Sequence, residues 1–92
     1  MNIRRTFPGR GDGEIFRRVH DVMSHLAERF SLDYRKDDSQ RSGRVSKMGV
    51  TGTYQVHSEE VVVDLKFPML VPSSMRQKVE EDIERKLDAL FS

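Results

Sequence analysis

Cysteine and tryptophan are both absent from this chain of 92 residues. The absence of cysteine excludes a disulfide framework, a thiolate metal site and a cysteine nucleophile, and it fits a reducing compartment. Long apolar runs are missing as well. No stretch approaches the roughly 18 residues of a membrane span, and the opening MNIRRTFPG lacks the apolar segment of a secretory signal. We therefore expect a cytoplasmic protein without a transmembrane segment.

An excess of charge of one sign is also missing. Lys and Arg number 16 against 15 Asp and Glu, so the net charge of +1 gives no general attraction to nucleic acid or to anionic membranes. The distribution is less even, because residues 1–47 hold 11 basic and 7 acidic side chains while residues 48–92 hold 5 and 8. Such asymmetry orients a partner in some proteins, but on a mixed surface it usually serves solubility alone.

Apolar residues are present at helical spacing in two segments. In the first segment, 15–30, the apolar stripe consists of Ile15, Val19, Val22, Met23, Leu26 and Phe30. In the second segment, 74–91, it consists of Met75, Val79, Ile83, Leu87 and Leu90. Each stripe covers one side of a helix, so we expect two amphipathic helices with one buried face each.

Between these helices the apolar period changes to two, which is typical of strands that are covered on one face. The alternation is clear in residues 32–35, 50–57 and 61–67, and apolar residues within 1–7 indicate a further strand at the start. The order β-α-β-β-β-β-α follows. We expect a single α+β domain over residues 1–92, in two layers: an antiparallel sheet of four to five strands, with both helices packed on one face.

Small and polar residues mark the ends of these elements. Asp12 is placed to cap the first helix, and Ser74 with Gln77 forms a capping box for the second. The segments predicted as loops or hairpin turns between strands are KDDSQRSG (36–43), SKMG (46–49) and HSEE (57–60).

The stretch GRGDG (9–13) has three interpretations. Arg10-Gly11-Asp12 is a tripeptide that adhesion receptors read on secreted proteins, but we expect a cytoplasmic chain. Glycines before a helix also cradle phosphates, yet this spacing matches neither a dinucleotide fingerprint nor a P-loop. Asp12 and Glu14 would moreover repel an anion at the helix start. A flexible turn into the helix is the favoured interpretation.

No constellation of residues indicates catalysis, a metal or a cofactor. His20 and His25 lie about 140° apart around the helix axis, so they do not form an i, i+4 metal pair, and His57 falls at a strand end. Ser24 is four residues from His20, but an exposed helix face offers neither an oxyanion hole nor a third group to hold the base. We expect polar surface roles for the histidines and no enzyme activity.

The outer face of the predicted sheet is mostly polar. An RNA-binding platform would need exposed aromatic residues there, whereas Tyr34 and Tyr54 are predicted to face the core, so no nucleic-acid partner is expected. Val62 lies on this outer face beside threonines, which favours a homodimer surface or an uncovered sheet edge.

The order of several motifs resembles one protein family. The segments LAERF, SLDYR, GVTGTYQV, a valine-rich strand, FPMLVP and VEEDIERKLDALF follow one another as in the small proteins of the polyhydroxyalkanoic acid system family. The resemblance begins near Ile15 and rests most on Phe30-x-Leu32-x-Tyr34-Arg35, Gly49-Val50-Thr51-Gly52, and a terminal helix with Glu80, Ile83 and Leu87. It implies a non-enzymatic binding or regulatory role at storage-polyester granules or with their coat proteins. It supplies no catalytic motif.

The resemblance leads to the hypothesis of a granule-binding protein. The helix stripes are needed for the core, so only residues at their edges, Phe16 and Phe91, are available for an apolar surface. On the sheet, Arg35 and Val62 are the candidate partner contacts.

A small-molecule binder is the alternative hypothesis. Its ligand would lie between the helices and the sheet, in space left by Gly52, Met23 and Met75. Methionine fills gaps more often than it marks a pocket, which counts against this alternative.

Overall fold

The computed structural model describes all residues, 1–92, and it confirms the predicted order of elements. In chain order the elements are β1 (Asn2–Thr6), α1 (Asp12–Phe30), β2 (Asp33–Asp37), β3 (Ser42–Lys47), β4 (Val50–His57), β5 (Glu60–Lys66) and α2 (Ser73–Asp88). The α+β fold and the N-terminal strand that the sequence indicated are therefore both present.

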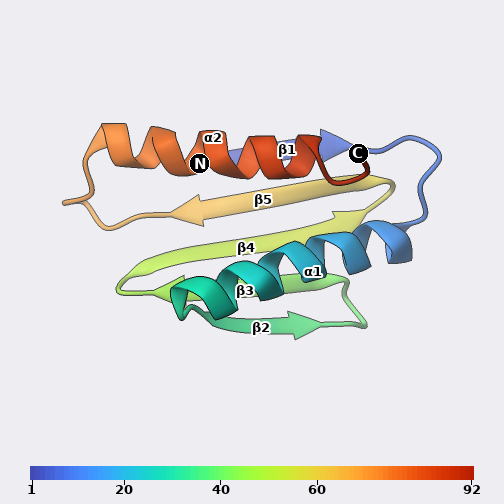
Figure 1. The fold of residues 1–92 in the computed structure, drawn as a ribbon, viewed down its shortest axis with the longest axis horizontal. Helices are drawn as coiled ribbons and strands as arrows, with labels where there is room; N and C mark the ends of the chain where they lie inside the picture. The colour runs from blue at the N-terminus through green and yellow to red at the C-terminus, as the bar shows by residue number, and fades with distance from the viewer.

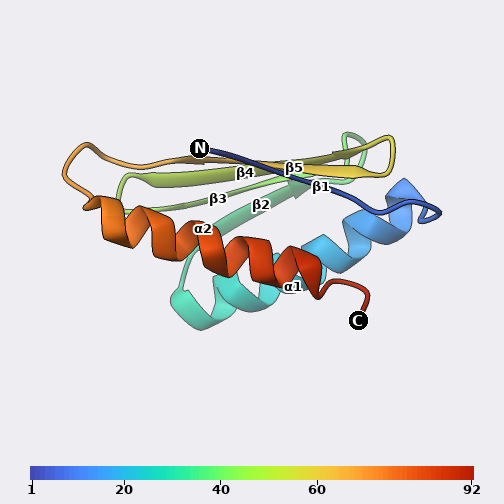
Figure 2. The same cartoon turned by 90° about the horizontal axis from the view of Figure 1, so that it is seen from above.

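Five strands form one sheet in the order β1-β5-β4-β3-β2, and every neighbouring pair is antiparallel. Both helices lie on the same face of this sheet, as Figure 2 shows, and the other face is uncovered. α2 runs beside β1 and β5, while α1 runs over β2, β3 and β4 (Figure 1). The molecule is elongated, with principal extents of 40 × 22 × 20 Å.

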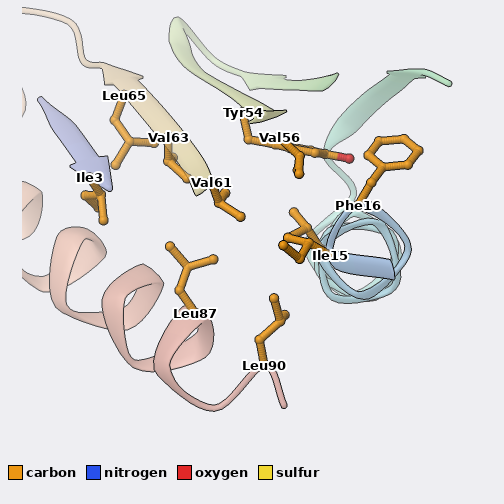
Figure 3. Packing of buried hydrophobic residues seen from close by; sticks show 11 residues of the cluster. Ile3, Ile15, Phe16, Tyr54, Val56, Val61, Val63, Leu65, Leu87 and Leu90 are labelled. Carbon is orange, nitrogen blue, oxygen red and sulfur yellow. The ribbon is translucent and has the colours of Figure 1, made fainter. Parts of the chain in front are cut away.

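The hydrophobic core fills the layer between the sheet and the helices (Figure 3). Its sheet side consists of alternate residues of β4 and β5, which the period of two places on one face, together with one residue of β1. Its helix side comes from the N-terminal half of α1 and from α2 and the residues after it. The buried apolar residues are Ile3, Ile15, Phe16, Val19, Tyr54, Val56, Val61, Val63, Leu65, Leu87 and Leu90.

The helix stripes are buried over only part of their predicted length. Phe30, the last member of the first stripe, is 50% exposed, and Met75, the first member of the second, is 55% exposed. The prediction of burial was wrong at these positions because the helices diverge toward one end of the molecule (Figure 1). Phe30 and Met75 both lie at that end, where the other helix is too far away to cover them.

The predicted cap of the first helix is also corrected. Gly11 is the N-cap and Asp12 is the first helical residue, with no side-chain cap bond. The Asp12 carboxylate instead accepts hydrogen bonds from the backbone N–H groups of Glu59 (2.8 Å) and Ser58 (3.1 Å). These donors, Glu59 first, hold the pKa of Asp12 below its usual range. The GRGDG stretch is thus a turn whose aspartate ties α1 to the β4–β5 turn.

The second predicted cap is wrong as well. α2 begins at Ser73 with Pro72 as its N-cap, and no side chain caps the helix, so the box of Ser74 and Gln77 does not form. The missing cap leaves the first backbone N–H groups of α2 without a side-chain acceptor.

Tight turns join the strands of the sheet. The β3–β4 and β4–β5 hairpins each turn in two residues, Met48–Gly49 and Ser58–Glu59, and all four residues have positive φ. This backbone matches the twist of the paired strands. The predicted hairpin turns are therefore confirmed.

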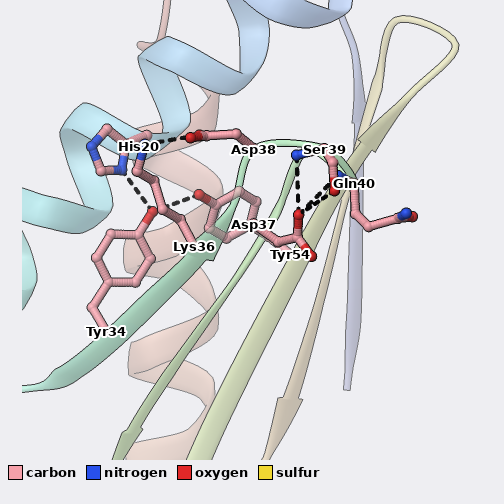
Figure 4. Close-up of polar contacts among 8 residues, drawn as sticks. All are labelled: His20, Tyr34, Lys36, Asp37, Asp38, Ser39, Gln40 and Tyr54. Atoms are coloured by element: carbon pink, nitrogen blue, oxygen red, sulfur yellow. Dashed lines mark hydrogen bonds and ion pairs between the residues drawn. The ribbon is translucent and has the colours of Figure 1, made fainter.

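The polar loop predicted over residues 36–43 is shorter than expected. β2 continues through Asp37, and β3 already begins at Ser42. The Asp37 carboxylate accepts hydrogen bonds from the hydroxyl (2.7 Å) and backbone N–H (3.0 Å) of Ser39 and from the N–H of Gln40 (3.2 Å), as Figure 4 shows. The Ser39 hydroxyl is the main reason that the pKa of Asp37 is lowered. These bonds fold the segment into a compact turn.

Candidate functional site

Three large apolar side chains project into solvent at one end of the molecule. Met48 lies in the β3–β4 turn and is 90% exposed, and Met69 and Leu70 lie in the loop between β5 and α2 and are each 95% exposed. Both segments lie at the left end of the molecule in Figure 1. We call these three residues the apolar tip.

The two loops of the apolar tip lie against each other. A Cβ atom added to Gly49 would stand 3.1 Å from Cγ of Pro68, so the β3–β4 turn touches the start of the β5–α2 loop. Lys47 donates from Nζ to the carbonyl oxygen of Phe30 at 2.5 Å, which places the half-exposed Phe30 ring next to the same end. The exposed apolar side chains therefore stand on adjoining loops at one end of the molecule.

Hydrogen bonds fix the backbone beneath Met69 and Leu70. The N–H of Val71 donates to the carbonyl of Pro68 (3.1 Å), which closes a turn with Met69 and Leu70 at its corner. Arg76 reaches back from α2 and donates from Nε to the carbonyl of Val71 (3.2 Å). The exposure of the two side chains is thus built into an ordered turn.

The backbone at Met48 is unusual for its side chain. Met48 has a φ of 50°, in the left-handed region that Gly, Asn and Asp occupy most readily. The first position of such a two-residue turn favours Asn or Gly, and Gly49 follows at the second. A methionine here costs conformational energy and gains no burial, which points to a role outside the fold.

A chain of hydrogen bonds links α1 to the sheet beside the core. Nδ1 of His20 lies 2.9 Å from the Tyr34 hydroxyl, which in turn lies 2.6 Å from the Tyr54 hydroxyl (Figure 4). Burial raises the pKa of both phenols. The phenols stay protonated at neutral pH, so they do not serve as bases or nucleophiles there. The purely surface role predicted for His20 was wrong, because its ring is partly buried and bonds to Tyr34.

No group of three or more His, Asp or Glu side chains is arranged to hold a metal ion. Neither helix combines the length and the apolar character that crossing a bilayer requires.

The four partner contacts proposed from the sequence do not come together. Phe16 is only 9% exposed and packs in the core, so its ring is not available to a surface. Phe91 is half-buried, with its ring edge-on to Phe7 at 5.3 Å. Arg35 and Val62 both line a shallow polar hollow on the uncovered face of the sheet, which separates them from the two phenylalanines.

An apolar cleft lies between the helices, where the small-molecule hypothesis places its ligand. The walls are apolar side chains of both helices, and the floor includes Gly52 and Leu65. Its volume is only about 70 Å³. Pockets for small molecules measure about 300 to 1,000 Å³, so this cleft holds no such ligand unless the helices move apart.

The residues of the apolar tip were missed as a site in the sequence. FPMLVP contained a usable signal, because two large apolar residues stand between prolines just after a strand, where no regular element continues to bury them. Met48 was already placed in a predicted turn, and turns are exposed. Nothing in the sequence indicates that these two loops lie together in space.

A comparison with known protein families gives a match over most of the chain. A model of the family described as "Putative polyhydroxyalkanoic acid system protein" matches residues 9–91. The chain belongs to this family. The match confirms the resemblance of the sequence motifs to the polyhydroxyalkanoic acid system family, and it includes both helices, four of the five strands and the apolar tip. No curated protein and no solved structure shows significant similarity to the chain.

Proposed function

We propose that this chain is a non-enzymatic cytoplasmic protein that binds the surface of polyhydroxyalkanoate granules through its apolar tip. Membership of the polyhydroxyalkanoic acid system family supports the link to the polyester. The observation that carries the proposal is the exposure of Met48, Met69 and Leu70 on ordered turns at one end of an elongated molecule. Exposed apolar groups gathered on one surface mark interaction sites.

Binding through the apolar tip does not require the side chains that form the core. A protein whose helix stripes met the granule would have to expose the residues that cover its sheet. The tip residues contribute almost nothing to the core, so the chain keeps its fold when they enter an apolar surface. Burying a side chain of this size contributes about 1.5 to 3 kcal/mol, and the three together about 4.5 to 9 kcal/mol before the costs of association.

For the polar groups outside the apolar tip, a structural role without catalysis is the simpler proposal. The hydrogen-bonded set of His20, Tyr34 and Tyr54 lies partly buried beside the core, with both phenols held in their neutral form. Its hydrogen bonds satisfy the polar ends of two inward-facing tyrosines, which is a structural task.

Fractionation of polyester-accumulating cells after chemical cross-linking tests the proposal. We expect the chain in the granule fraction, cross-linked through its tip end to granule components. Cross-links between copies would indicate a homodimer, and cross-links to a coat protein would identify that protein as the partner. Recovery of the chain only in the soluble fraction would count decisively against granule binding.

A further inference from the structure

The segments that form the apolar tip carry positive charge alone. Residues 42–50 and 66–78 hold five Lys or Arg and no Asp or Glu, although the whole chain is nearly neutral. None of these five cations lies within 4.0 Å of a carboxylate, since every ion pair of the molecule involves other residues. The five are Arg44, Lys47, Lys66, Arg76 and Lys78.

The cations nearest the tip stand on both sides of the sheet. Lys47 directly precedes Met48, and its pairing with Val50 places it on the helix-facing side. Lys66 ends β5, and its pairing with Thr51 places it on the uncovered side. Lys47 and Lys66 therefore flank the apolar side chains from two directions.

The start of α2 adds to the positive electrostatic potential at the tip. Helix α2 begins three residues after Leu70, and its first turn contains no acidic residue. The positive end of the helix dipole thus faces the tip without being neutralised by a carboxylate. Arg76 lies in the same part of the helix and donates to the carbonyl of Met69 at 3.5 Å.

We infer that the apolar tip binds an anionic lipid surface, with the methionines and leucine among the acyl chains and the lysines at the level of the headgroups. This inference rests on the proposed granule function and names the chemistry of the surface. Apolar side chains flanked by Lys and Arg are the pattern of interfacial anchors, because the cations pair with anionic headgroups while the apolar groups enter below them. A polyester without lipid is uncharged and would leave the cations without an anionic partner.

The charge next to the tip differs from the nearly neutral average of the chain. A net charge of +1 gives no general attraction to anionic membranes, but the fold places Lys47 and Lys66, neither of them within 4.0 Å of a carboxylate, on the two sides of the tip. The attraction acts over about one Debye length, roughly 10 Å, so this local charge matters more than the total.

Flotation with lipid vesicles tests the inference. Wild-type protein should float with vesicles of equimolar phosphatidylcholine and phosphatidylglycerol, bind vesicles of phosphatidylcholine alone much more weakly, and lose binding as salt is raised. Lys47→Gln with Lys66→Gln should weaken binding about 25-fold, because each cation near an anionic surface contributes about fivefold. The matched control, Arg17→Gln with Lys36→Gln, removes the same charge from exposed positions away from the tip and should bind as wild type does.

Particles of lipid-free polyester and isolated native granules separate failure of the inference from failure of the proposed function. Binding to granules and to lipid-free particles, but not to anionic vesicles, would overturn the inference and leave granule binding intact. Equal binding to charged and neutral vesicles would overturn the role of the cations. Binding to vesicles but not to granules would refute the proposed function, and binding to none of the three surfaces would refute both.

Discussion

Replacement of Gly43 by alanine tests the packing that holds β3 against β4. Gly43 pairs with Tyr54 across the two strands, and the Tyr54 ring lies over the glycine. A Cβ atom at position 43 would stand 2.4 Å from Cε1 and 2.7 Å from Cζ of this ring. Both distances are far below van der Waals contact, so the ring has to move.

Movement of the ring has two costs that the structure lets us estimate. Tyr54 is only 5% exposed, and forcing extra volume into such a site costs about 1 to 3 kcal/mol. A displaced ring also loses its 2.6 Å hydrogen bond to Tyr34, which costs about 0.5 to 1.5 kcal/mol. We therefore expect Gly43→Ala to lower the free energy of unfolding by about 1.5 to 4.5 kcal/mol.

Urea denaturation at equilibrium measures the loss in free energy of unfolding that Gly43→Ala causes. The slope of the transition shows whether the substitution also alters the unfolded state. Gly13→Ala is the matched control. A Cβ there has only the end of the Arg41 side chain nearby, at 3.9 Å, so the same substitution within a helix should stabilise by about 0.5 to 1 kcal/mol. In a Tyr54→Val background the cost of Gly43→Ala should largely disappear. A Gly43→Ala protein as stable as wild type would refute the proposed packing.

Three further predictions concern the tip and the titration of buried or bonded groups. Met48→Asn should raise the free energy of unfolding by about 1 kcal/mol in urea, because Asn tolerates the left-handed backbone better, and should weaken granule binding in sedimentation. The pKa of Asp12 is depressed in the folded state by the N–H of Glu59, so its stabilising contribution is present above the unfolded pKa and lost as the pH falls through the folded pKa. Denaturation measured below about pH 4 should show this loss, and Asp12→Asn should flatten it. Burial raises the folded pKa of Tyr34 and Tyr54, so their contribution is complete below the unfolded value of about 10 and lost as the pH rises toward the folded values. A Tyr34→Phe variant should lose less stability in alkali than wild type does, and an equal loss in both would contradict this assignment.

Much of the fold follows from periodicity in the sequence. The period of two predicted that Tyr34 and Tyr54 face the core and that Val62 lies on the outer face. In the structure Tyr54 is buried, Tyr34 packs partly buried against the core, and Val62 lines the hollow on the uncovered face. The exposure of Phe30 and Met75 could not be predicted in this way. A helical stripe shows which side of a helix is apolar, but not over what length a second helix packs beside it. That depends on the angle between the helices, to which residues throughout the core contribute.

The local chemistry of the helix starts was harder to predict. Asp12 has the residue type and position of an N-cap, but the β4–β5 turn offers two backbone donors from residues 46 and 47 positions away in sequence. A tertiary contact of this kind has no local signature. The apolar tip was missed for the same reason, since the β3–β4 turn and the β5–α2 loop are separated in the chain and touch, at Gly49 and Pro68, only because β3, β4 and β5 are neighbours.

The central claim, that the apolar tip attaches this protein to granules, is tested most directly by sedimentation of the purified chain with isolated polyester granules. The informative comparison is between wild type and Met69→Ser with Leu70→Ser. Both side chains are 95% exposed, so the variant should unfold at the same urea concentration as wild type. We predict that wild type sediments with the granules and that the variant stays in the supernatant. A stable variant that sediments as fully as wild type would contradict the claim.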